Sequence, residues 1–489
     1  MRQSIIEAII KNSQNHPDKT AVVIGDDQIS YKSFVDRIII KKEELEDKGV
    51  VIGDRVILAA VPNIDYLAFY FAIHLIGAIA VPVDKAATIQ TISDVIEDVQ
   101  PSCIMLNESI GTSDYEETAE HDDIQLPESK SVADIIYTTG TTGQAKGVML
   151  THANMIAGAK NVIHGGNVQK EEVCLLPVPL HHAYGLTTMR AIFYIGATLV
   201  LQDGFASLKK THKNIHQNRC TRAYLIPAAI PLLIRQTADN LPALLGILNK
   251  LEFCTAPLNA HYRKLLNEIL PKVTVYNSYG ATEAARSIYM NVSENMDRCE
   301  AVGKPVEGVK VRIADPDCPE KTLAIHQVGR LVISGDMVMA GYYQRPDISS
   351  QVIVGSELLM GDLGYMDEAG YIYVLGREQD IMNIGGEKVS PQEIEEVVLG
   401  SGLVQECACL AEKDERQVLG DIPVLYVVYK NAGDNQGKAL SLFIKEHIEK
   451  YKRPGRIVKV DVLPRNYMGK LDRNRLRECL WENGHAGKI

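Results

Sequence analysis

Short apolar runs alternate with amphipathic segments up to about residue 301. The runs are rich in Val, Ile and Leu and are bounded by polar residues, a pattern typical of strands buried on both faces. They predict strands at residues 55–60, 78–83, 102–106, 198–201, 222–226 and 250–254. Helices are predicted at residues 66–75, 228–238 and 260–269. This alternation indicates mostly parallel sheets flanked by helices.

The pattern changes after Ala301, where short β-like runs become frequent. These runs are predicted at residues 309–313, 329–333 and 371–375. Beyond a charged link at residues 376–380 we expect helices at 391–399 and 438–450 and strands at 404–410, 423–429 and 457–461. The predicted fold class is therefore α/β. Residues 1–378 form a large N-terminal part with subdomains and a β-rich portion, and residues 379–489 form a small α+β domain.

Length and charge narrow the class of protein. A chain of 489 residues corresponds to about two to four domains of typical size. Lys and Arg number 51 and Asp and Glu 62, so the net charge is −11. This balance argues against a nucleic-acid partner, because such proteins neutralise phosphates with basic side chains. A small phosphate-bearing ligand remains compatible, since a local site can be basic in an acidic protein.

Neither a signal peptide nor a transmembrane segment is predicted. The most apolar run, residues 67–83, is short for a membrane span and contains His74 and Pro82, so we expect a buried helix that leads into a core strand. The nine cysteines are irregularly spaced and form no CxxC pair, which disfavours a structural zinc site. Reduced thiols in a cytoplasmic protein are the simplest interpretation.

One loop has the composition of a phosphate-binding loop. It follows an apolar strand, and its glycines allow backbone N–H groups to point inward beside several hydroxyls and one lysine. The candidate residues are Thr138, Thr139, Gly140, Thr141, Thr142, Gly143 and Lys146. A Walker A motif is excluded, because Ala145 stands where Gly is required and Gly147 where Ser or Thr is required.

The segment YTTGTTGQAKGVMLTHAN at residues 137–154 resembles the phosphate loop of the adenylate-forming enzymes. This superfamily comprises acyl-CoA synthetases, beetle luciferases and peptide-synthetase adenylation domains. Other segments resemble its motifs in the same order. They are PLHHAYG at 179–185, YNSYGATE at 276–283, GDL at 361–363 with GR at 376–377, DIMNIGGEKVSP at 380–391 and LPRNYMGK at 463–470. The resemblance covers nearly the whole chain and is closest in pattern to acyl-CoA ligases.

The resemblance implies activation of a carboxylic acid by ATP. Attack of the carboxylate on the α-phosphate gives an acyl-adenylate and pyrophosphate, and the approach of two anions requires positive charge and a metal ion. Glu283 is a hard oxygen ligand suited to Mg²⁺, and Thr282 can bond a phosphate oxygen. Asp362 can accept hydrogen bonds from both ribose hydroxyls, with Arg377 beside it. Lys470 is implied to contact the reacting carboxylate and the α-phosphate.

The resemblance also assigns the surfaces that bind the substrates. Catalytic roles are implied for His182, Thr282, Glu283 and Lys470. The rest of the ATP site is assigned to Ala256, Pro257, Asn277, Ser278, Tyr279, Gly280 and Ala281. The acyl pocket is assigned to His182, Tyr184, Cys254 and Gly280. For His182, a structural histidine is the alternative to a position beside the acyl and thiol tunnel.

In the family the C-terminal domain rotates between two poses, one for each half-reaction. One pose brings the lysine to ATP, and the other brings in a loop that shapes a thiol tunnel. We therefore expect a mobile domain with its hinge at Gln379. Gly385 and Gly386 are expected to line the tunnel, because residues without a Cβ allow close passage of a pantetheine arm.

Departures from the family pattern bear on the substrate. Cys254 and Thr255 stand where a Gly-rich segment is usual, which favours a small or medium acid, and the absence of an acidic residue from LHHAYGLTT disfavours an α-amino acid. The predicted function is an ATP- and Mg²⁺-dependent ligase that transfers the acyl group to CoA. An enzyme that loads a carrier-protein phosphopantetheine is the alternative, and an inactive nucleotide-binding module a remote one. Similarity of HHAYGLTT to luciferases does not establish light emission.

Overall fold

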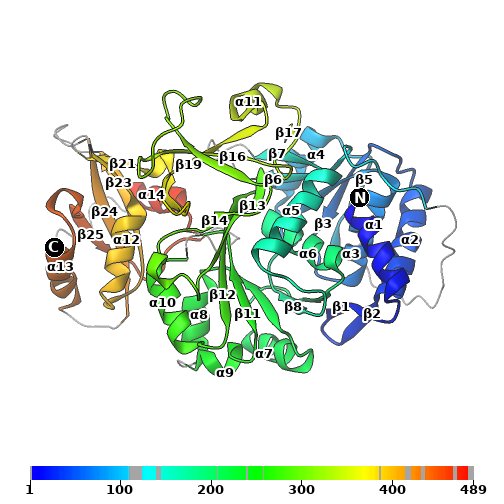
Figure 1. The fold of residues 1–489 in the computed structure, drawn as a ribbon, viewed down its shortest axis with the longest axis horizontal. Helices are drawn as coiled ribbons and strands as arrows, with labels where there is room; N and C mark the ends of the chain where they lie inside the picture. The colour runs from blue at the N-terminus through cyan, green and yellow to red at the C-terminus, as the bar shows by residue number, and fades with distance from the viewer. Residues whose placement is uncertain are drawn as a thin grey trace.

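The computed structural model describes residues 3–107, 110, 124–138, 145–205, 207–237, 240–256, 258–384, 387–413, 420–430, 435–465 and 471–482. Within these residues the chain is a mixed α/β structure (Figure 1). A large N-terminal part is built on three sheets, and a smaller C-terminal part, orange and red in the figure, lies at one end of it.

The first sheet carries the two strands that flank the predicted phosphate loop. Its strands, in spatial order, are β17 (Gly341–Tyr342), β7 (Lys146–Thr151), β6 (Val132–Thr138), β4 (Ile79–Val83), β3 (Arg55–Ala59) and β5 (Cys103–Met105). Strands β3 to β6 pair in parallel, whereas β7 is antiparallel to both β6 and β17. The register places Thr138 opposite Lys146, so the two ends of the loop are held side by side.

The apolar run that resembles a membrane span is a buried helix, as expected. Helix α3 (Ile64–Ile76) begins where the Asn63 side chain accepts a hydrogen bond from the Tyr66 N–H, and it ends at Gly77 in the left-handed conformation. Its residues from 65 to 76 are all buried, and β4 follows directly. In the part of the chain described, no helix combines the length and apolar character needed to cross a bilayer.

The second sheet has nine strands and carries the adenine motif near one edge. In spatial order these are β14 (Lys304–Pro305), β13 (Ala284–Asn291), β12 (Thr274–Ala281), β11 (Lys250–Phe253), β10 (Arg222–Leu225), β8 (Val173–Leu176), β9 (Thr198–Leu201), β1 (Thr20–Ile24) and β2 (Asp27–Ser30). The inner strands from β12 to β1 pair in parallel, and the edges are antiparallel. Parallel pairing with alternating helices confirms the pattern predicted from the apolar runs.

Helices join the first two sheets into one core. Helix α5 (His152–Gly165) contacts β7 of the first sheet and β13 of the second, and it packs on α6 (Ala183–Ile195), which contacts β8 and β9. The other helices of this part are α1 (Ile5–Asn15), α2 (Tyr31–Asp47), α4 (Ile89–Val99), α7 (Leu208–Gln217), α8 (Ala229–Gln236), α9 (Leu241–Leu245), α10 (Ala260–Ile269) and α11 (Pro346–Val352).

The third sheet is the β-rich portion expected beyond residue 301. Its strands are β15 (Lys310–Ala314), β16 (Gly329–Ser334), β18 (Ile353–Val354), β19 (Glu357–Met366) and β20 (Ile372–Arg377). All of its pairings are antiparallel, and β20 lies along β19. Strand β19 is long enough to pair with β16, β18 and β20.

The C-terminal part has its own core. It contains the hairpin β21 (Met382–Ile384) and β22 (Glu387–Val389), the sheet β23 (Val404–Lys413), β24 (Asp421–Tyr429) and β25 (Arg456–Lys459), and helices α12 (Pro391–Gly400), α13 (Gln436–His447) and α14 (Arg473–Glu482). Apolar residues of α12 and α13 pack on one face of this sheet, and Leu463 and Leu476 pack on the other. Helix α12 also contacts α10 and β20 of the N-terminal part.

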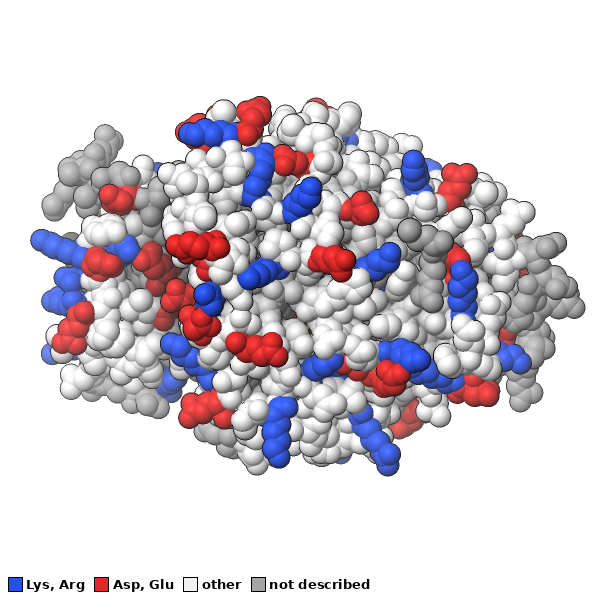
Figure 2. Space-filling model, viewed as in Figure 1, with Lys and Arg blue, Asp and Glu red and all other residues white. Residues whose placement is uncertain are grey.

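The predicted fold class is therefore confirmed, as a large α/β part with a β-rich portion and a small α+β part. The elements that were predicted differ from the observed ones mainly at their ends, as for the strand predicted at 102–106 and observed as β5. Other elements, among them α5, α6 and β7, were not predicted. The boundary between residues 378 and 379 stays a prediction. On the face in Figure 2, basic and acidic side chains are interspersed, with no broad field of one sign.

Candidate active site

Two residues from different sheets meet at the nucleotide end of the predicted site. Tyr279 lies near the end of β12, and Asp362 lies in the middle of β19. The Tyr279 hydroxyl donates a 2.5 Å hydrogen bond to Asp362 Oδ2. Burial and the adjacent carboxylate raise the pKa of Tyr279 well above its ordinary value, so this phenol remains a hydrogen-bond donor. The adenine motif and the proposed ribose ligand are thus joined directly.

Arg377 completes this corner of the site. Antiparallel pairing of β19 with β20 places Arg377 opposite Asp362. Its Nε lies 3.2 Å from Asp362 Oδ1, and the charge of that carboxylate raises the pKa of Arg377. Asp362 is buried while the Arg377 side chain remains about half exposed, at 48%. The two residues that the family motif separates in sequence are therefore brought together by strand register.

Thr282 and Glu283 occupy the tip of a tight hairpin. Strands β12 and β13 pair up to Ala281 and Ala284, which leaves only these two residues as the turn. The Glu283 backbone carbonyl accepts a hydrogen bond from the Met339 N–H, which ties the turn to the segment before β17. Both side chains are partly exposed, so the hairpin presents a hydroxyl and a carboxylate at its tip.

Tyr342 connects this hairpin tip to the phosphate loop. Its hydroxyl donates a 2.8 Å hydrogen bond to Glu283 Oε1, and its ring lies 5.4 Å from Lys146 Nζ. Strand β17 pairs with β7 so that Tyr342 lies opposite Val148, close to Lys146 in sequence. Burial, followed by the Glu283 charge, raises the pKa of Tyr342, which keeps the phenol protonated. The candidate metal ligand and the loop lysine therefore contact one shared aromatic residue.

Thr138 and Lys146 are the described ends of the predicted phosphate loop. They pair across β6 and β7, and Thr138 Oγ1 donates a 3.4 Å hydrogen bond to the Lys146 carbonyl. Some of the predicted site residues lie outside the described residues. These are Thr139, Gly140, Thr141, Thr142, Gly143, Pro257, Gly385, Gly386 and Lys470.

The remaining residues of the adenine motif are held by their backbone surroundings. The Asn277 amide donates to the Val302 carbonyl at 3.4 Å. Gly280 lies so close to the neighbouring strand that a Cβ there would be 2.4 Å from the backbone nitrogen of Arg286. Only glycine fits this position, because the obstacle is main chain and cannot move aside.

The residues assigned to the acyl pocket lie in or next to α6, β11 and β12. Tyr184 lies in the first turn of α6 and is buried, with its hydroxyl within hydrogen-bond distance of the Leu225 and Glu252 carbonyls at 3.1 and 3.2 Å. Its hydroxyl is therefore engaged by the main chain. Cys254 follows β11 and is also buried. His182 is the residue immediately before α6, and its buried ring lies 3.9 Å from that of His181.

The segment after β11 has unusual backbone geometry. Thr255 adopts a φ of +81°, a left-handed conformation that a β-branched residue rarely adopts. Its neighbours are Cys254, assigned to the acyl pocket, and Ala256, assigned to the adenine wall. Glycine adopts this geometry without a steric penalty, whereas this chain imposes it on a threonine.

Gln379 lies between two ion pairs that face opposite parts of the molecule. The residue is the middle one of the short 3₁₀ turn Glu378–Asp380, which links β20 to β21. Glu378 forms an ion pair with Arg330 of the third sheet at 2.7 Å, whereas Asp380 forms one with Arg477 of α14 at 3.0 Å. The charges on its two sides thus belong to different structural units.

Sequence reasoning missed Tyr342 and a buried ion-pair network behind Tyr184. Tyr342 belongs to a two-residue strand that no apolar run could predict. The network includes Glu252 and Arg286, which lie in strands whose residues are mostly buried. A charged residue inside an apolar run is the signal that could have found the network, because such a residue needs a buried partner.

Residues 9–343 match the family model described as AMP-binding enzyme, and residues 393–470 match the model of its C-terminal domain. The chain therefore belongs to the AMP-binding enzyme family, which confirms the expected adenylate-forming superfamily. Among curated proteins it is similar to 2-succinylbenzoate–CoA ligase of Bacillus cytotoxicus, with 28% identity over 483 residues that cover 95% of this chain and 97% of the relative. The same enzyme of Bacillus cereus is 27% identical over 486 residues, covering 95% and 96%.

Solved structures show the same fold over the full length. o-Succinylbenzoate CoA synthetase from Bacillus subtilis, in complex with its acyl-adenylate intermediate, has a TM-score of 0.85 at 24% identity and covers 99% of both chains. An anthranilate CoA ligase in complex with anthranoyl-AMP has a TM-score of 0.88 at 20% identity, covering 98% of this chain and 99% of that one. These likenesses support the fold class independently of the motifs.

Proposed function

We propose that this chain is an ATP-dependent acid–CoA ligase that forms an acyl-adenylate and pyrophosphate and then transfers the acyl group to CoA. The observation that carries the proposal is the meeting of Glu283, Tyr342 and Lys146 at one corner of the site, beside the strands that bear the phosphate-loop ends. A cation, a carboxylate and a fixed donor at this point suit a magnesium triphosphate. Membership of the AMP-binding enzyme family supports the same activity.

At the nucleotide end, Asp362 holds the ribose by accepting hydrogen bonds from its hydroxyls. Tyr279 and Arg377 already fix both carboxylate oxygens, so the side chain is oriented before the nucleotide arrives. Asn277, Ser278 and Ala256 surround the adenine. Lys146, Thr138 and the loop between them contact the phosphates, and Thr282 bonds a phosphate oxygen.

The surroundings of Glu283 fit a Mg²⁺ ligand. Tyr342 donates to Oε1, which leaves Oε2 available to a cation. Mg²⁺ is typically held by one or two carboxylates together with phosphate oxygens and water, so a single protein carboxylate suffices. Within the described residues no group of three or more His, Cys, Asp or Glu could form an all-protein metal cage. When bound, the ion neutralises charge on the phosphates and orients them.

The proposed acid is a small or medium carboxylic acid without an α-amino group. It lies against the Tyr184 ring and Cys254, beside Gly280, with His182 at the pocket border. The nearest acidic side chain on these strands, Glu252, is buried and engaged by arginines, so it does not offer a carboxylate to an ammonium group. 2-Succinylbenzoate, the substrate in the names of the relatives, is the first acid to test.

The C-terminal residues 379–489 supply Lys470 to the first half-reaction and Gly385 and Gly386 to the second. Gln379 is the proposed hinge, supported by the ion pairs that tie Glu378 to the N-terminal part and Asp380 to the C-terminal part. CoA is the proposed acceptor. We also place the protein in the cytoplasm, where the free cysteines among its described residues stay reduced.

An acid panel tests the proposal. Purified protein is assayed for exchange of labelled pyrophosphate into ATP with 2-succinylbenzoate, anthranilate, benzoate, hexanoate and phenylalanine. Acid-dependent exchange with a non-amino acid, and acyl-CoA on addition of CoA, are expected. Exchange with phenylalanine alone would contradict the acid class. If the thioester forms on an acyl carrier protein and not on CoA, the carrier protein replaces CoA as the acceptor. Absence of exchange with every acid would overturn the proposed function.

A further inference from the structure

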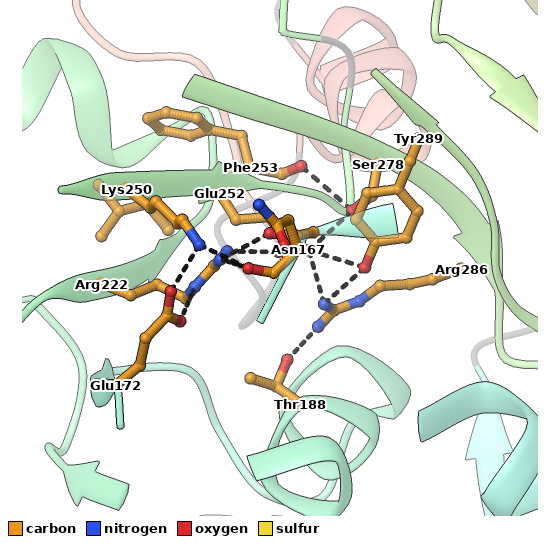
Figure 3. Close-up of polar contacts among 12 residues, drawn as sticks. Asn167, Glu172, Thr188, Arg222, Lys250, Glu252, Phe253, Ser278, Arg286 and Tyr289 are labelled. Atoms are coloured by element: carbon orange, nitrogen blue, oxygen red, sulfur yellow. Dashed lines mark hydrogen bonds and ion pairs between the residues drawn. The ribbon is translucent and has the colours of Figure 1, made fainter. Parts of the chain in front are cut away.

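A network of ion pairs with alternating charges runs through the protein interior, behind the residues assigned to the acyl pocket (Figure 3). Lys250 contacts Glu172 at 2.7 Å, and Glu172 accepts a 2.7 Å hydrogen bond from Arg222. Arg222 lies 3.4 Å from Glu252, which pairs with Arg286 at 2.6 Å. Arg222, Glu252 and Arg286 are at most 3% exposed. The network therefore ends in Arg286, whose side chain is almost wholly buried.

Within this network, Glu252 has several hydrogen-bond and ion-pair partners that offset the burial of its charge. Its Oε1 accepts from Arg286 at 2.6 Å, from the Tyr289 hydroxyl at 3.0 Å and from Ser278 Oγ at 3.3 Å, while Oε2 faces Arg222. Buried ion pairs stabilise a fold only when such additional hydrogen bonds offset the desolvation of the charges. A set of apolar side chains of similar volume would stabilise the fold as well, so stability alone does not explain this arrangement.

Arg286 extends from Glu252 to the acyl motif. Its Nη2 donates to the Tyr184 carbonyl at 3.0 Å and to Thr188 Oγ1, both in α6. Its guanidinium lies 4.3 Å from the centre of the Tyr184 ring, a cation–π contact. The planar guanidinium therefore contacts both the backbone and the ring of Tyr184. Because its N–H donors are held in a rigid fork, these contacts restrict rotation of the Tyr184 side chain.

The backbone of Arg286 supports the adenine motif. Gly280 approaches its nitrogen so closely that a Cβ would be 2.4 Å away. Arg286 adopts a φ of +33°, a conformation unfavourable for a residue with a side chain, so the surrounding contacts must hold it there. Ser278, two residues before Gly280, is tied to the same network through Glu252. The arginine thus touches the acyl and the adenine motifs at once.

We propose that Arg286, held by Glu252, is a positioning residue that sets the distance between the acyl pocket wall at Tyr184 and the adenine motif at Gly280, and so determines which acids are activated. This inference rests on the proposed acid–CoA ligase function. Arg286 acts on the acid through Tyr184 and Gly280 and has no part in proton or phosphoryl transfer. Loss of the guanidinium fork frees the Tyr184 ring, while the ribose corner at Asp362 and Arg377 stays intact.

The test compares two neutralised ion pairs. Glu252→Gln with Arg286→Met removes both charges of the network's inner pair, so neither is left buried alone. Arg37→Gln with Asp65→Asn neutralises another ion pair, in which a partly buried arginine and a buried aspartate are joined at 2.6 Å between α2 and α3. Arg286→Lys, which keeps the charge but loses the fork, is measured as well. The readouts are KM for the acid, KM for ATP and kcat in pyrophosphate exchange, and the melting temperature.

We expect the inner-pair variant to raise KM for the acid about tenfold and to change KM for ATP less than about twofold. The guanidinium that it removes contacts Tyr184, whereas the main chain of Arg286, on which Gly280 packs, is retained. The Arg286→Lys variant shows the same selective rise. The control pair lowers the melting temperature and leaves both KM values near those of the wild type. The acid used is the panel member that the wild type exchanges fastest.

The outcomes distinguish failure of the role proposed for Arg286 from failure of the proposed ligase function. Wild-type exchange combined with an unchanged acid KM in the variants overturns this inference alone, as does an equal rise in the control pair. If the double variant does not fold, the Arg286→Lys result decides by the same criterion. Absence of exchange in the wild type with every acid overturns the proposed function and the inference with it.

Discussion

Tyr342 donates a 2.8 Å hydrogen bond to Glu283, and the two residues come from segments that the chain brings together only through sheet pairing. Glu283 lies in the β12–β13 turn of the second sheet, and Tyr342 lies in β17 of the first. The bond therefore spans the junction between the two sheets. It fixes the orientation of the one carboxylate that the family motif offers to a metal ion, next to Lys146.

Replacing Tyr342 with Phe removes this donor and keeps the ring beneath Lys146. Because partners that orient a metal ligand affect metal affinity or activity about 10- to 100-fold, we expect kcat/KM for magnesium ATP to fall about tenfold. Tyr343→Phe, at the adjacent position, is the matched control and should stay near wild type. Pyrophosphate exchange at varied Mg²⁺ measures the effect, and equal activity of the two variants would remove Tyr342 from the site.

Asp362→Asn removes the charge that engages Tyr279 and Arg377. Hydrogen bonds to charged groups contribute about 1.5–3 kcal/mol, so we expect KM for ATP to rise at least about tenfold, with a smaller change in KM for the acid. Asp367→Asn, just beyond the same strand, loses backbone contacts remote from the ribose and should affect only the melting temperature. A larger effect on the acid than on ATP would contradict the assignment of Asp362 to the ribose.

Substitutions of Thr255 test whether its left-handed backbone conformation is strained. At a φ of +81° glycine avoids the steric penalty that any Cβ incurs, whereas alanine retains it. We therefore expect Thr255→Gly to be more stable than Thr255→Ala by about 1 kcal/mol in the free energy of unfolding, measured in urea. If the alanine variant is as stable as the glycine variant, the left-handed conformation is not maintained in solution.

We predict that Glu396, on helix α12, makes the stability of the protein dependent on pH. Burial raises its pKa to about 7, the nearby carboxylates of Glu300 and Glu395 add to the rise, and Arg263 opposes it. Since the folded protein holds this proton more tightly than the unfolded chain, the stability linked to Glu396 is greatest at low pH and is lost as pH rises towards 7.

The Glu396→Gln variant stays neutral at every pH. Its melting temperature, relative to the wild type, is expected to increase between pH 5 and pH 8, since only the wild type gains a poorly solvated charge over that range. Glu393→Gln, an exposed position on the same helix, serves as the control. A difference between Glu396→Gln and wild type that is constant over this range would show that Glu396 titrates as an ordinary surface carboxylate.

Lys470→Ala is expected to abolish pyrophosphate exchange while leaving the reaction of added acyl-adenylate with CoA, which gives acyl-CoA and AMP, largely intact. The reason is that the lysine is assigned to the first half-reaction, where two anions meet, and not to thiol transfer. Lys459→Ala, in β25 of the same C-terminal part, is a control for removal of a lysine there. Exchange at near wild-type rate in Lys470→Ala would show that another group serves this role.

Much of the fold could be predicted because its strands are short, apolar and locally distinct. The run at 198–201 corresponds to β9 without change, and the helix predicted at 66–75 lies inside α3. Strand β7 was not predicted, since its burial alternates irregularly and it follows a polar loop. Sheet order was also beyond the sequence, because pairing joins segments far apart in the chain and periodicity reports only local structure.

The candidate site divides in the same way. Asp362 and Arg377 could be identified because each stands in a short motif, and the register of β19 and β20 then places them together. Tyr342 and Arg286 could not, because their significance comes from what folding places beside them. For Glu252, its place as a charged residue in a strand predicted to be buried was the available signal, and it pointed to a partner without identifying it.

Transfer of oxygen from the acid to AMP is the most direct test of the proposed chemistry. The protein is incubated with ATP, Mg²⁺, CoA and 2-succinylbenzoate, or another acid that supports exchange, labelled with ¹⁸O in its carboxyl groups. If the carboxylate attacks the α-phosphate, the bridging oxygen leaves with AMP when the thiol takes the acyl group, so each AMP carries one ¹⁸O by mass spectrometry. Unlabelled AMP, or label found in ADP or phosphate instead, would contradict an acyl-adenylate.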